Sequence, residues 1–310
     1  MKCLVTGATG FIGNALTKRL VEESHQVKAI IHTVKPESFE DNVEYITADI
    51  TDLASLENIE CDCDVVLHCA ALVKDFGSKT LFCKVNVEGT KNIVRLCKNT
   101  KCFIYLGHIL YEFPHTYLYY TQSKYQAEQY LIKKYKQDNF PVVVIRPGNV
   151  YGPGATLVLR LLEAIQNNKI ALINNGNGIF HHTYIDNLID ALLLSMTNTK
   201  AIGGTFDITD GDHSITWGRY FNDLAELAGK NPIKKNISKT TANLIGHFMC
   251  ALYRFTRVQP LVTPTAVHIL ANTTEVSIKK AEKILGYTPK IDYVEGMKQV
   301  QKWLQEESFI

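Results

Sequence analysis

Three glycines near the start of the chain have the spacing of a loop that holds a phosphate. The run Gly7-Ala8-Thr9-Gly10-Phe11-Ile12-Gly13 follows the apolar residues 3–6 and precedes a helical pattern that extends to about Glu23. Glycine permits a sharp turn and a close approach to a ligand, and the following helix presents its positive dipole end to an anion. The run therefore predicts a dinucleotide site that includes Gly7, Thr9, Gly10, Phe11, Ile12 and Gly13, with an ordinary tight turn as the alternative.

Strands and helices alternate through the first half of the chain and would position this turn. Apolar, β-rich runs separated by helices are typical of a parallel sheet that is covered on both faces. We therefore expect an α/β protein with a Rossmann-type doubly wound parallel sheet and a smaller C-terminal substrate-binding region. The expected strands are 3–6, 27–32, 43–46, 64–69, 102–106 and 142–146, and the expected helices end at about 23 and cover 84–98 and about 123–137.

The pattern changes after Pro147, where Gly152, Pro153 and Gly154 mark a turn. Residues 1–152 are expected to form the dinucleotide-binding domain, to which a later segment, about 183–210, returns. Residues 153–310 are expected to form mainly the substrate-binding region, interleaved with the first domain. Later expected elements are helices at 157–166 and 186–196, a polar loop at 174–177 and a strand at 205–207.

Composition and charge exclude several classes of protein. The 310 residues carry a formal net charge of +2, so no basic bias indicates a nucleic-acid partner. No run approaches the roughly 20 apolar residues that span a bilayer, so no transmembrane segment is expected. The first strand begins at once, without the charged leader and apolar core of a secretory signal.

The eight cysteines are expected to be reduced. Cys3, Cys69 and Cys102 lie in apolar runs typical of buried strands, and Cys97 lies in a helical pattern. Cys61-Asp62-Cys63 is a lone C-x-C without a second ligand pair at zinc-like spacing, so no metal site is expected. Reduced cysteines that act as small core residues predict a cytoplasmic protein.

Residues 240–255 are apolar on one face, with Lys239, Arg254 and Arg257 nearby. A helix that covers a substrate pocket, or that simply packs in the protein, is favoured over a helix on a membrane surface. The reason is that its polar face is not rich in Lys and Arg, as the polar faces of surface-binding helices usually are.

Several further segments match one known family in the same order along nearly the whole chain. They are Asp49-Ile50, His68-Cys69-Ala70-Ala71, Asn86-Val87-Glu88-Gly89-Thr90, Tyr120-Thr121-Gln122-Ser123-Lys124, Arg146-Pro147-Gly148-Asn149-Val150-Tyr151-Gly152, Tyr184-Ile185-Asp186-Asn187 and Leu285-Gly286-Tyr287-Thr288-Pro289. On these residues the chain resembles the extended short-chain dehydrogenase/reductase family, which includes NAD-dependent epimerases and dehydratases. The segments Tyr253-Arg254, 260–264 and 277–281 resemble its 3β-hydroxysteroid dehydrogenase-like branch.

The resemblance implies that the glycine turn binds NAD or NADP. Asp49 would accept a hydrogen bond from the adenine amino group, although a turn or helix-cap carboxylate is the alternative for it. Ala70 and Ala71 would line the cofactor. The cofactor-binding residues expected beyond the turn are His32, Lys35, Asp49, Ile50, Ala70, Ala71, Asn86, Gly107, Tyr120, Lys124, Pro147, Gly148, Asn149 and Val150, with Pro147, Gly148 and Asn149 beside the nicotinamide.

The end of the second expected strand bears on the choice between the two cofactors. An acidic residue about 20 positions beyond the glycines would bind the ribose 2′-hydroxyl and select NAD. Residues 29–35 contain no carboxylate, and His32 stands where NADP-using relatives often place arginine. Lys35 would add a second positive contact to a 2′-phosphate. NADP is therefore favoured over NAD, with solvated loop positions as the alternative for both residues.

Tyr120 and Lys124 are four residues apart at the start of an expected helix and so share one face. The resemblance implies that Tyr120 is the general acid/base that exchanges a proton with a substrate hydroxyl or carbonyl. A nearby ammonium favours tyrosinate and lowers the tyrosine pKa toward the working pH. Lys124 would also hold the nicotinamide ribose.

One group that the family usually carries is missing. Gly107 occupies the position of a serine whose hydroxyl would bind the substrate oxygen. His108 could donate instead, although an ordinary loop histidine is favoured. The segment between Gly107 and Tyr120 is also shorter than in relatives. Loss of one donor to a developing oxyanion can lower a rate on the order of 10²–10³-fold, so the activity is expected to be altered.

The sequence predicts less specific roles for five other polar residues. His181 and His182 could face the substrate, but without further ligands they do not predict a metal site. Asp186 and Asn187 are expected to anchor the helix that follows them. Arg146 is expected to order its loop rather than to contact substrate.

An NAD(P)-dependent oxidoreductase is the favoured function. It would transfer hydride to or from a hydroxyl or carbonyl carbon of a bulky sterol-, terpenoid- or flavonoid-like small molecule. A nucleotide-sugar epimerase or dehydratase is the alternative, for which Arg160 and Lys169 could bind the diphosphate. A non-catalytic NAD(P)-binding sensor or complex subunit is the second alternative. The resemblance also suggests a homodimer built on helices 84–98 and 123–137.

Overall fold

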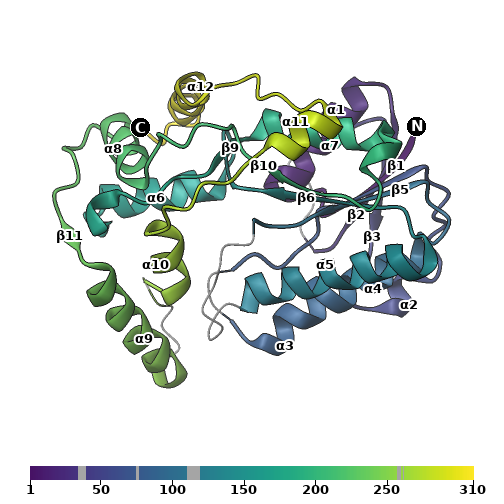
Figure 1. The fold of residues 1–310 in the computed structure, drawn as a ribbon, viewed down its shortest axis with the longest axis horizontal. Helices are drawn as coiled ribbons and strands as arrows, with labels where there is room; N and C mark the ends of the chain where they lie inside the picture. The colour runs from purple at the N-terminus through teal and green to yellow at the C-terminus, as the bar shows by residue number, and fades with distance from the viewer. Residues whose placement is uncertain (34–39, 75–76, 110–118, 257–259, 261) are drawn as a thin grey trace.

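A seven-stranded parallel sheet forms the centre of the computed structural model, which describes residues 1–33, 40–74, 77–109, 119–256, 260 and 262–310 (Figure 1). Its strand order is β10-β6-β5-β4-β1-β2-β3, so the predicted doubly wound sheet is confirmed. The order reverses at β1, and ligands of such sheets bind where the strand order reverses, at the carboxyl ends of the strands. The strands are β1 (Lys2–Thr6), β2 (Gln26–Ile31), β3 (Val43–Thr47), β4 (Val65–His68), β5 (Cys102–Leu106), β6 (Val142–Pro147) and β10 (Thr205–Ile208).

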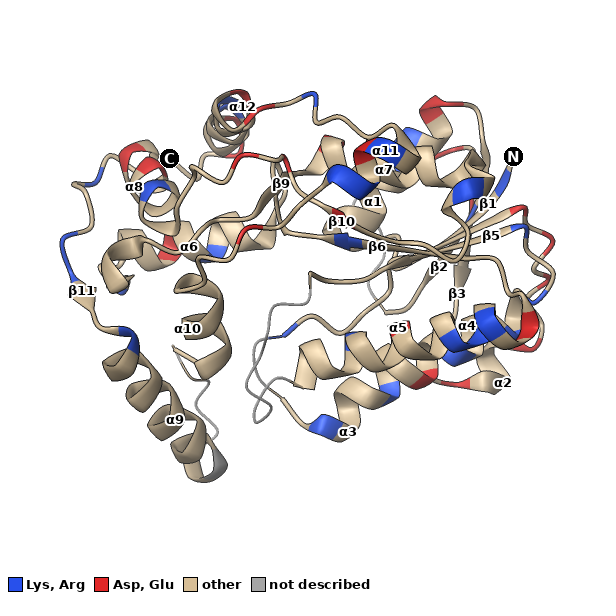
Figure 2. Ribbon diagram, viewed as in Figure 1, with Lys and Arg blue, Asp and Glu red and all other residues tan. Residues whose placement is uncertain are grey.

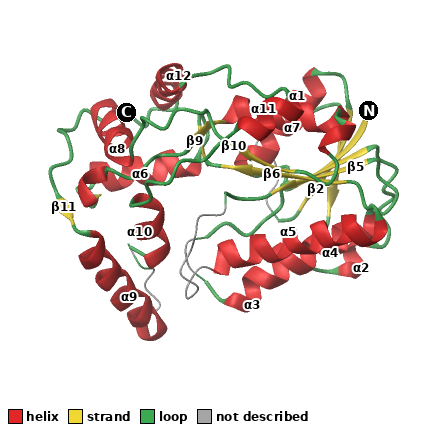
Figure 3. Cartoon of the chain, in the orientation of Figure 1, coloured by secondary structure: helices red, strands yellow, loops and turns green. Residues whose placement is uncertain are grey.

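Side chains of the central strands alternate between two buried cores. Leu4 and Phe103 belong to one core, and their neighbours Val5 and Ile104 belong to the other. Because both faces are buried, these strands are unbroken apolar runs in the sequence. One helical layer contains α1 (Phe11–Glu22), α7 (Ile185–Thr197) and α11 (Lys279–Leu285), and the other contains α2 (Leu53–Leu56), α3 (Lys79–Phe82), α4 (Gly89–Leu96) and α5 (Tyr119–Asp138) (Figure 3).

The single helix expected at 84–98 is wrong in detail. A π-helical turn, η1 (Cys83–Glu88), separates α3 from α4, and α4 ends at Leu96. At the junction a Cβ on Gly89 would lie 2.7 Å from Cδ1 of Ile50, so only glycine lets the helix pack this closely. Such turns often occur at functional sites, and this one lies beside α5, whose start at Tyr119 places Tyr120 in the first helical turn.

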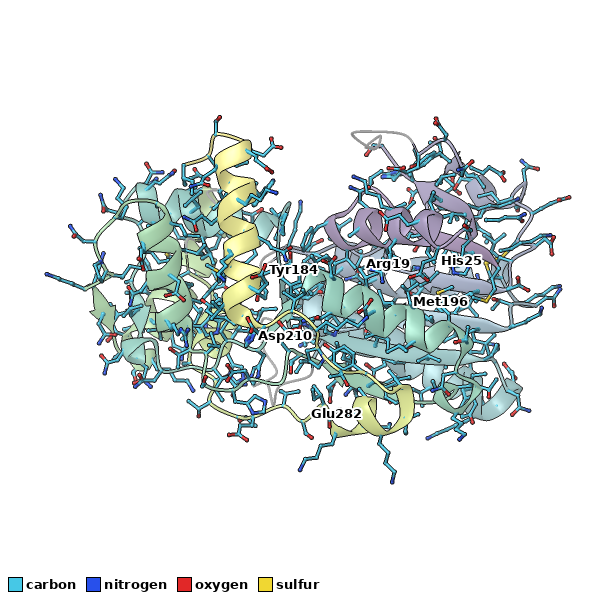
Figure 4. The ribbon with its side chains drawn as sticks, turned by 90° about the horizontal axis from the view of Figure 1, so that it is seen from above. Arg19, His25, Tyr184, Met196, Asp210 and Glu282 are labelled. Carbon is cyan, nitrogen blue, oxygen red and sulfur yellow. A yellow bond between two sulfur atoms is a disulfide. The ribbon has the colours of Figure 1, made fainter. Side chains whose placement is uncertain are left out.

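Of the elements expected after Pro147, the helices at 157–166 and 186–196 and the strand at 205–207 are confirmed, and the structure adds several elements that the sequence did not predict. In this part of the chain the side chain of Asp210 joins two segments. Its carboxylate accepts hydrogen bonds from the Tyr184 amide at 2.8 Å and from Asn187 Nδ2 at 2.7 Å (Figure 4). Asn187 also donates to the Ile291 carbonyl, so it anchors α7 as expected. The further elements are β7 (Asn149–Tyr151), α6 (Thr156–Gln166), β8 (Leu172–Ile173), η2 (Asn174–Gly176), β9 (His182–Tyr184), η3 (Thr199–Ala201), α8 (Trp217–Leu227), β11 (Asn236–Ile237), α9 (Lys239–Thr256), α10 (Pro264–Leu270) and α12 (Tyr293–Glu306).

The expectation that every cysteine is reduced is wrong for Cys61 and Cys97, which form a disulfide. Their Cα atoms are 5.5 Å apart although 36 positions separate them in the chain, so sequence spacing alone could not reveal the pair. Cys63 Sγ lies 3.1 Å from Cys61 Sγ, and the three sulfur atoms lie within 4.8 Å of one another. With the disulfide closed, two of these sulfurs are not thiolate ligands for a metal.

Among the described helices, none has the length and hydropathy needed to cross a membrane.

The disulfide leads to a measurable prediction about thiol content and stability. Protein that is unfolded without reductant should show six reactive thiols, whereas fully reduced protein should show eight. Because the bond restricts the unfolded chain, Cys97→Ser should lower the free energy of unfolding by about 4 kcal/mol. Cys83→Ser, which leaves the bond intact, is the control in denaturant titration. Eight reactive thiols in unreduced protein would contradict the pairing.

Candidate active site

A cavity of about 870 Å³ contains nearly all the site residues that the sequence predicted. It extends from the glycine turn to the carboxyl ends of β5 and β6. The predicted residues that line it are Gly7, Thr9, Gly10, Phe11, Ile12, Gly13, His32, Asp49, Ile50, Ala70, Ala71, Gly107, His108, Tyr120, Lys124, Pro147, Gly148, Asn149 and Val150. Asn86 does not line the cavity, and Lys35 lies outside the described residues.

The glycine turn is shaped by three close approaches of the backbone. Gly7 has φ +72°, and a Cβ there would lie 2.8 Å from Cα of Ala70 at the end of β4. A Cβ on Gly13 would overlap the carbonyl oxygen of Gly7. Gly10 begins α1 without a side-chain cap, so no side chain of this turn occupies the first amides of the helix. No side chain thus covers the backbone amides at the start of α1, and a phosphate-binding turn needs that arrangement.

Two basic residues lie near the carboxylate of Asp49 at one end of the cavity. His32 Nε2 is 3.7 Å from Asp49 Oδ2, and Lys84 also lines the cavity. Partial burial acts to raise the pKa of Asp49, but hydrogen bonds from Thr51 and the nearby His32 and Lys84 charges hold it below its ordinary value. Asp49 is therefore ionised at neutral pH. Lys84 was missed as a site residue because the sequence placed it simply at the start of a helix.

Lys124 is buried at the other end of the cavity. Its Nζ donates to the Leu106 carbonyl at 2.5 Å and lies 4.3 Å from the ring centroid of Tyr105. Burial lowers the pKa of Lys124 to about 7, against the nearby Cys69 and Glu128, which raise it. A lysine in this environment loses its proton easily, and a negative partner in the cavity would restore the charge.

Tyr120 lies between two aromatic rings at the start of α5. Its ring centroid is 5.6 Å from that of His108 and 6.4 Å from that of Phe82. Phe82 was missed by sequence reasoning, because nothing in its spacing shows that α3 packs beside α5. The two rings limit the positions that the Tyr120 phenol can take within the cavity wall.

Gly107, which stands at the position of the missing serine, packs closely against β6. A Cβ there would lie 3.2 Å from Cγ of Arg146 and 3.3 Å from the Ile145 carbonyl, so a side chain would be crowded against β6. The next residue, His108, lines the cavity. Burial, followed by the Lys124 and Arg146 charges, lowers the pKa of His108 to about 4, so its ring is neutral at neutral pH.

Arg146 fixes helix α5 to the sheet. Its Nε donates to Glu128 Oε2 at 2.9 Å, and its Nη2 donates to the second carboxylate oxygen. Glu128 is on α5 and its side chain is only 2% exposed. A two-point bond of this kind fixes orientation as well as distance, so Arg146 orders α5 and not, as was expected, its own loop. As expected, it does not line the cavity.

Of the other candidate residues, the structure places some in the cavity wall and some outside it. Arg160 lines the cavity, but Lys169 does not. His181 and His182 are 2% and 1% exposed and do not line the cavity, so the expectation that they face a substrate is wrong. His182, the first residue of β9, lies among the rings of Phe180 and Tyr293, and the ring of His181 lies 6.0 Å from that of His213. Apolar lining residues that sequence reasoning missed are Val73, Leu81 and Leu157.

Comparison with known proteins identifies related sequences and folds. The model of the NAD dependent epimerase/dehydratase family matches residues 3–209. The chain is 27% identical to a 2-alkyl-3-oxoalkanoate reductase of Stenotrophomonas maltophilia over 97% of this chain and 98% of the relative. It is 26% identical to a decarboxylating sterol-4-alpha-carboxylate 3-dehydrogenase of Candida albicans, over 98% and 97%. A Bordetella bronchiseptica enzyme solved in complex with NADH has the same fold, with a TM-score of 0.79, 19% identity and coverage of 99% and 93%.

The packing of the glycine turn predicts unequal effects of two similar substitutions. Gly13→Ala should lower the free energy of unfolding by about 3 kcal/mol, because overlap with the Gly7 carbonyl outweighs the roughly 1 kcal/mol that alanine adds to a helix. Gly10→Ala should cost less than about 1 kcal/mol, because its Cβ would lie 3.3 Å from the same oxygen and its backbone is extended. Urea titration of the ligand-free variants measures both. Equal stability of the two would contradict this account of the turn.

Proposed function

The chain belongs to the NAD-dependent epimerase/dehydratase family, and on this basis we propose that it is an NAD(P)-dependent oxidoreductase acting on a bulky apolar alcohol or ketone. The observation that carries the proposal is that Tyr120 and Lys124 line the same cavity as the glycine turn. A nicotinamide cofactor held by that turn would supply the acceptor or donor of hydride. The acid and base chemistry would come from the protein.

In this proposal Tyr120 moves the proton of the substrate oxygen. For alcohol oxidation the phenolate takes the hydroxyl proton, and for ketone reduction the phenol returns it. The Lys124 ammonium favours the phenolate, because an opposite charge nearby stabilises the ionised form. The same phenolate favours the protonated lysine, which offsets the burial that lowers the pKa of Lys124 to about 7.

His108 takes the place of the absent serine in this proposal. It lines the cavity, its ring centroid is 5.6 Å from that of Tyr120, and its lowered pKa keeps the ring neutral. A neutral imidazole carries one N–H donor and one acceptor nitrogen. The N–H would donate to the substrate oxygen and so supply the hydrogen bond that Gly107 cannot.

The proposed substrate class rests on the cavity wall and on the relatives. Val73, Leu81 and Leu157 give the wall apolar side chains. The two relatives described above are named for an alkyl-oxoalkanoate and a sterol carboxylate, both with large hydrocarbon parts. A nucleotide-sugar epimerase is the second candidate, and the presence of Arg160 in the cavity favours it, because arginine can bind a diphosphate.

NADP is the proposed cofactor. Residues 29–35, at the end of β2 and directly after it, contain no carboxylate to bind a ribose 2′-hydroxyl, and His32 and Lys84 both line the cavity near Asp49. A 2′-phosphate would draw His32 away from its contact with Asp49, which is weak because His32 is 64% exposed.

The role of Tyr120 is tested by removing its hydroxyl. Tyr120→Phe should lower kcat by at least about 10²-fold, since the variant cannot exchange the proton, while the Kd for cofactor changes little. Tyr125→Phe, on the same helix and 46% exposed, is the matched control. Nicotinamide absorbance is followed with sterol-like alcohols and, separately, with product analysis on UDP-sugars. Cofactor binding without turnover of either class would favour a non-catalytic sensor.

The cofactor preference is tested by reversing the charge at the end of β2. Wild-type protein should bind NADPH at least about tenfold more tightly than NADH, and His32→Asp should reverse the order, because a carboxylate repels the 2′-phosphate and binds a 2′-hydroxyl. Titration of nicotinamide fluorescence gives both constants. His247→Asp makes the same change on exposed α9, away from the cavity lining, and should leave the ratio unchanged. Equal or tighter binding of NADH by wild-type protein would exclude the preference.

A further inference from the structure

Helix α9 is attached to the protein by one narrow side. Ala242 and Cys250 are buried, and Gly246 between them packs so closely that a Cβ would lie 3.1 Å from the backbone nitrogen of Pro264. These residues recur every fourth position and therefore lie along one line of the helix, against the start of α10. Small residues on this line let the two helices approach closely.

The opposite side of α9 exposes large apolar side chains. The exposed fractions are 73% for Leu244, 67% for Phe248, 43% for Leu252 and 85% for Phe255. Their spacing of four, four and three residues forms one continuous stripe. The sequence favoured a helix that covers a substrate pocket or packs in the protein over one on a membrane surface, because few Lys and Arg lie on its polar face. Within the described chain, however, the stripe stays exposed, and α9 extends away from the rest of the molecule (Figure 1). A row of this kind on a water-exposed helix indicates a surface that something else covers.

The charge of the surrounding sequence indicates what covers it. Residues 230–274 contain no Asp or Glu, and their basic residues are Lys230, Lys234, Lys235, Lys239, Arg254 and Arg257. This segment has a formal charge of +6 although the whole chain has +2, so the remaining residues together carry −4. Figure 2 shows basic residues before and at the start of α9 and no acidic residue along α9 or α10. Lys230, Lys234, Lys235 and Lys239 are exposed.

We propose that α9 docks on the surface of an anionic lipid bilayer. The helix lies in the plane of the interface, with Leu244, Phe248, Leu252 and Phe255 inserted at the boundary between headgroups and acyl chains. The lysines that precede it contact anionic headgroups. A second copy of the chain is a poorer occupant, because a two-fold contact between identical faces would bring two positive segments together. The charge of +6 on residues 230–274, against −4 on the rest of the chain, therefore favours lipid.

Vesicle binding tests the proposal without cofactor or substrate, so its outcome is independent of the proposed catalytic function. Wild-type protein should co-sediment with vesicles of equal parts phosphatidylglycerol and phosphatidylcholine at least about tenfold more strongly than with phosphatidylcholine alone. Salt should weaken the binding, because it screens headgroup charge. The variant L244S/F248S/L252S/F255S and the variant K234Q/K235Q/K239Q should each lose at least about tenfold. The variant V294S/F309S, which removes exposed apolar side chains elsewhere, should bind as the wild type does.

A second measurement uses a single substitution, so it does not depend on the folding of variants that carry several substitutions. In Phe248→Trp the added indole should show a blue-shifted emission on the anionic vesicles and should be quenched by lipids brominated near the headgroup end of the acyl chains. Absence of wild-type binding to anionic vesicles, or unchanged binding of the four-serine variant, would overturn the proposal. Gel filtration that shows an oligomer dissolved by the four-serine variant, together with no vesicle binding, would instead assign the stripe to contact between copies.

Discussion

A buried chain of hydrogen bonds connects the glycine turn to the helix that carries Tyr120, and the site depends on it. Thr6 Oγ1, at the end of β1, lies 2.7 Å from His68 Nδ1, and His68 Nε2 lies 2.9 Å from Thr90 Oγ1. Thr90 donates to the Asn86 carbonyl at 2.7 Å, and Asn86 Nδ2 donates to Ser123 Oγ at 2.9 Å. Ser123 Oγ donates to the Tyr120 carbonyl at 2.7 Å. The first four of these short bonds are buried and the last is partly buried, so the glycine turn and the start of α5 hold a fixed separation.

This hydrogen-bond network requires that its side chains stay uncharged and buried. Burial lowers the pKa of His68 to about 3, so its ring remains neutral and can donate from one nitrogen and accept at the other. The π-helical turn η1 places Asn86 on this path rather than in the cavity, where the resemblance had placed it. There its Oδ1 also accepts from the Leu72 amide at 2.7 Å, which ties the segment after β4 to the same network. Asn86 therefore acts through the residues that it positions.

The sequence allowed the sheet and the glycine turn to be predicted because both depend on local patterns. Unbroken apolar runs follow from burial on two faces, and the spacing of Gly7 and Gly13 follows from close backbone contacts. Features that depend on distant packing could not be predicted in this way. The Cys61–Cys97 disulfide and the position of Lys84 in the cavity each join segments whose meeting is set by the fold. The apolar face of α9 was predicted, but its exposure depends on how few elements pack against it.

Position 107 shows how closely the ends of β5 and β6 pack beside α5. Arg146 needs space beside the end of β5 to reach Glu128, and its Cγ would lie 3.2 Å from a Cβ at position 107. The bond to Glu128 fixes α5, and α5 carries Tyr120 and Lys124. A side chain at position 107 would press on the same arginine that orients the helix. In the proposed function, the hydrogen bond that a serine would have supplied comes from His108, which is neutral and lies in the cavity wall.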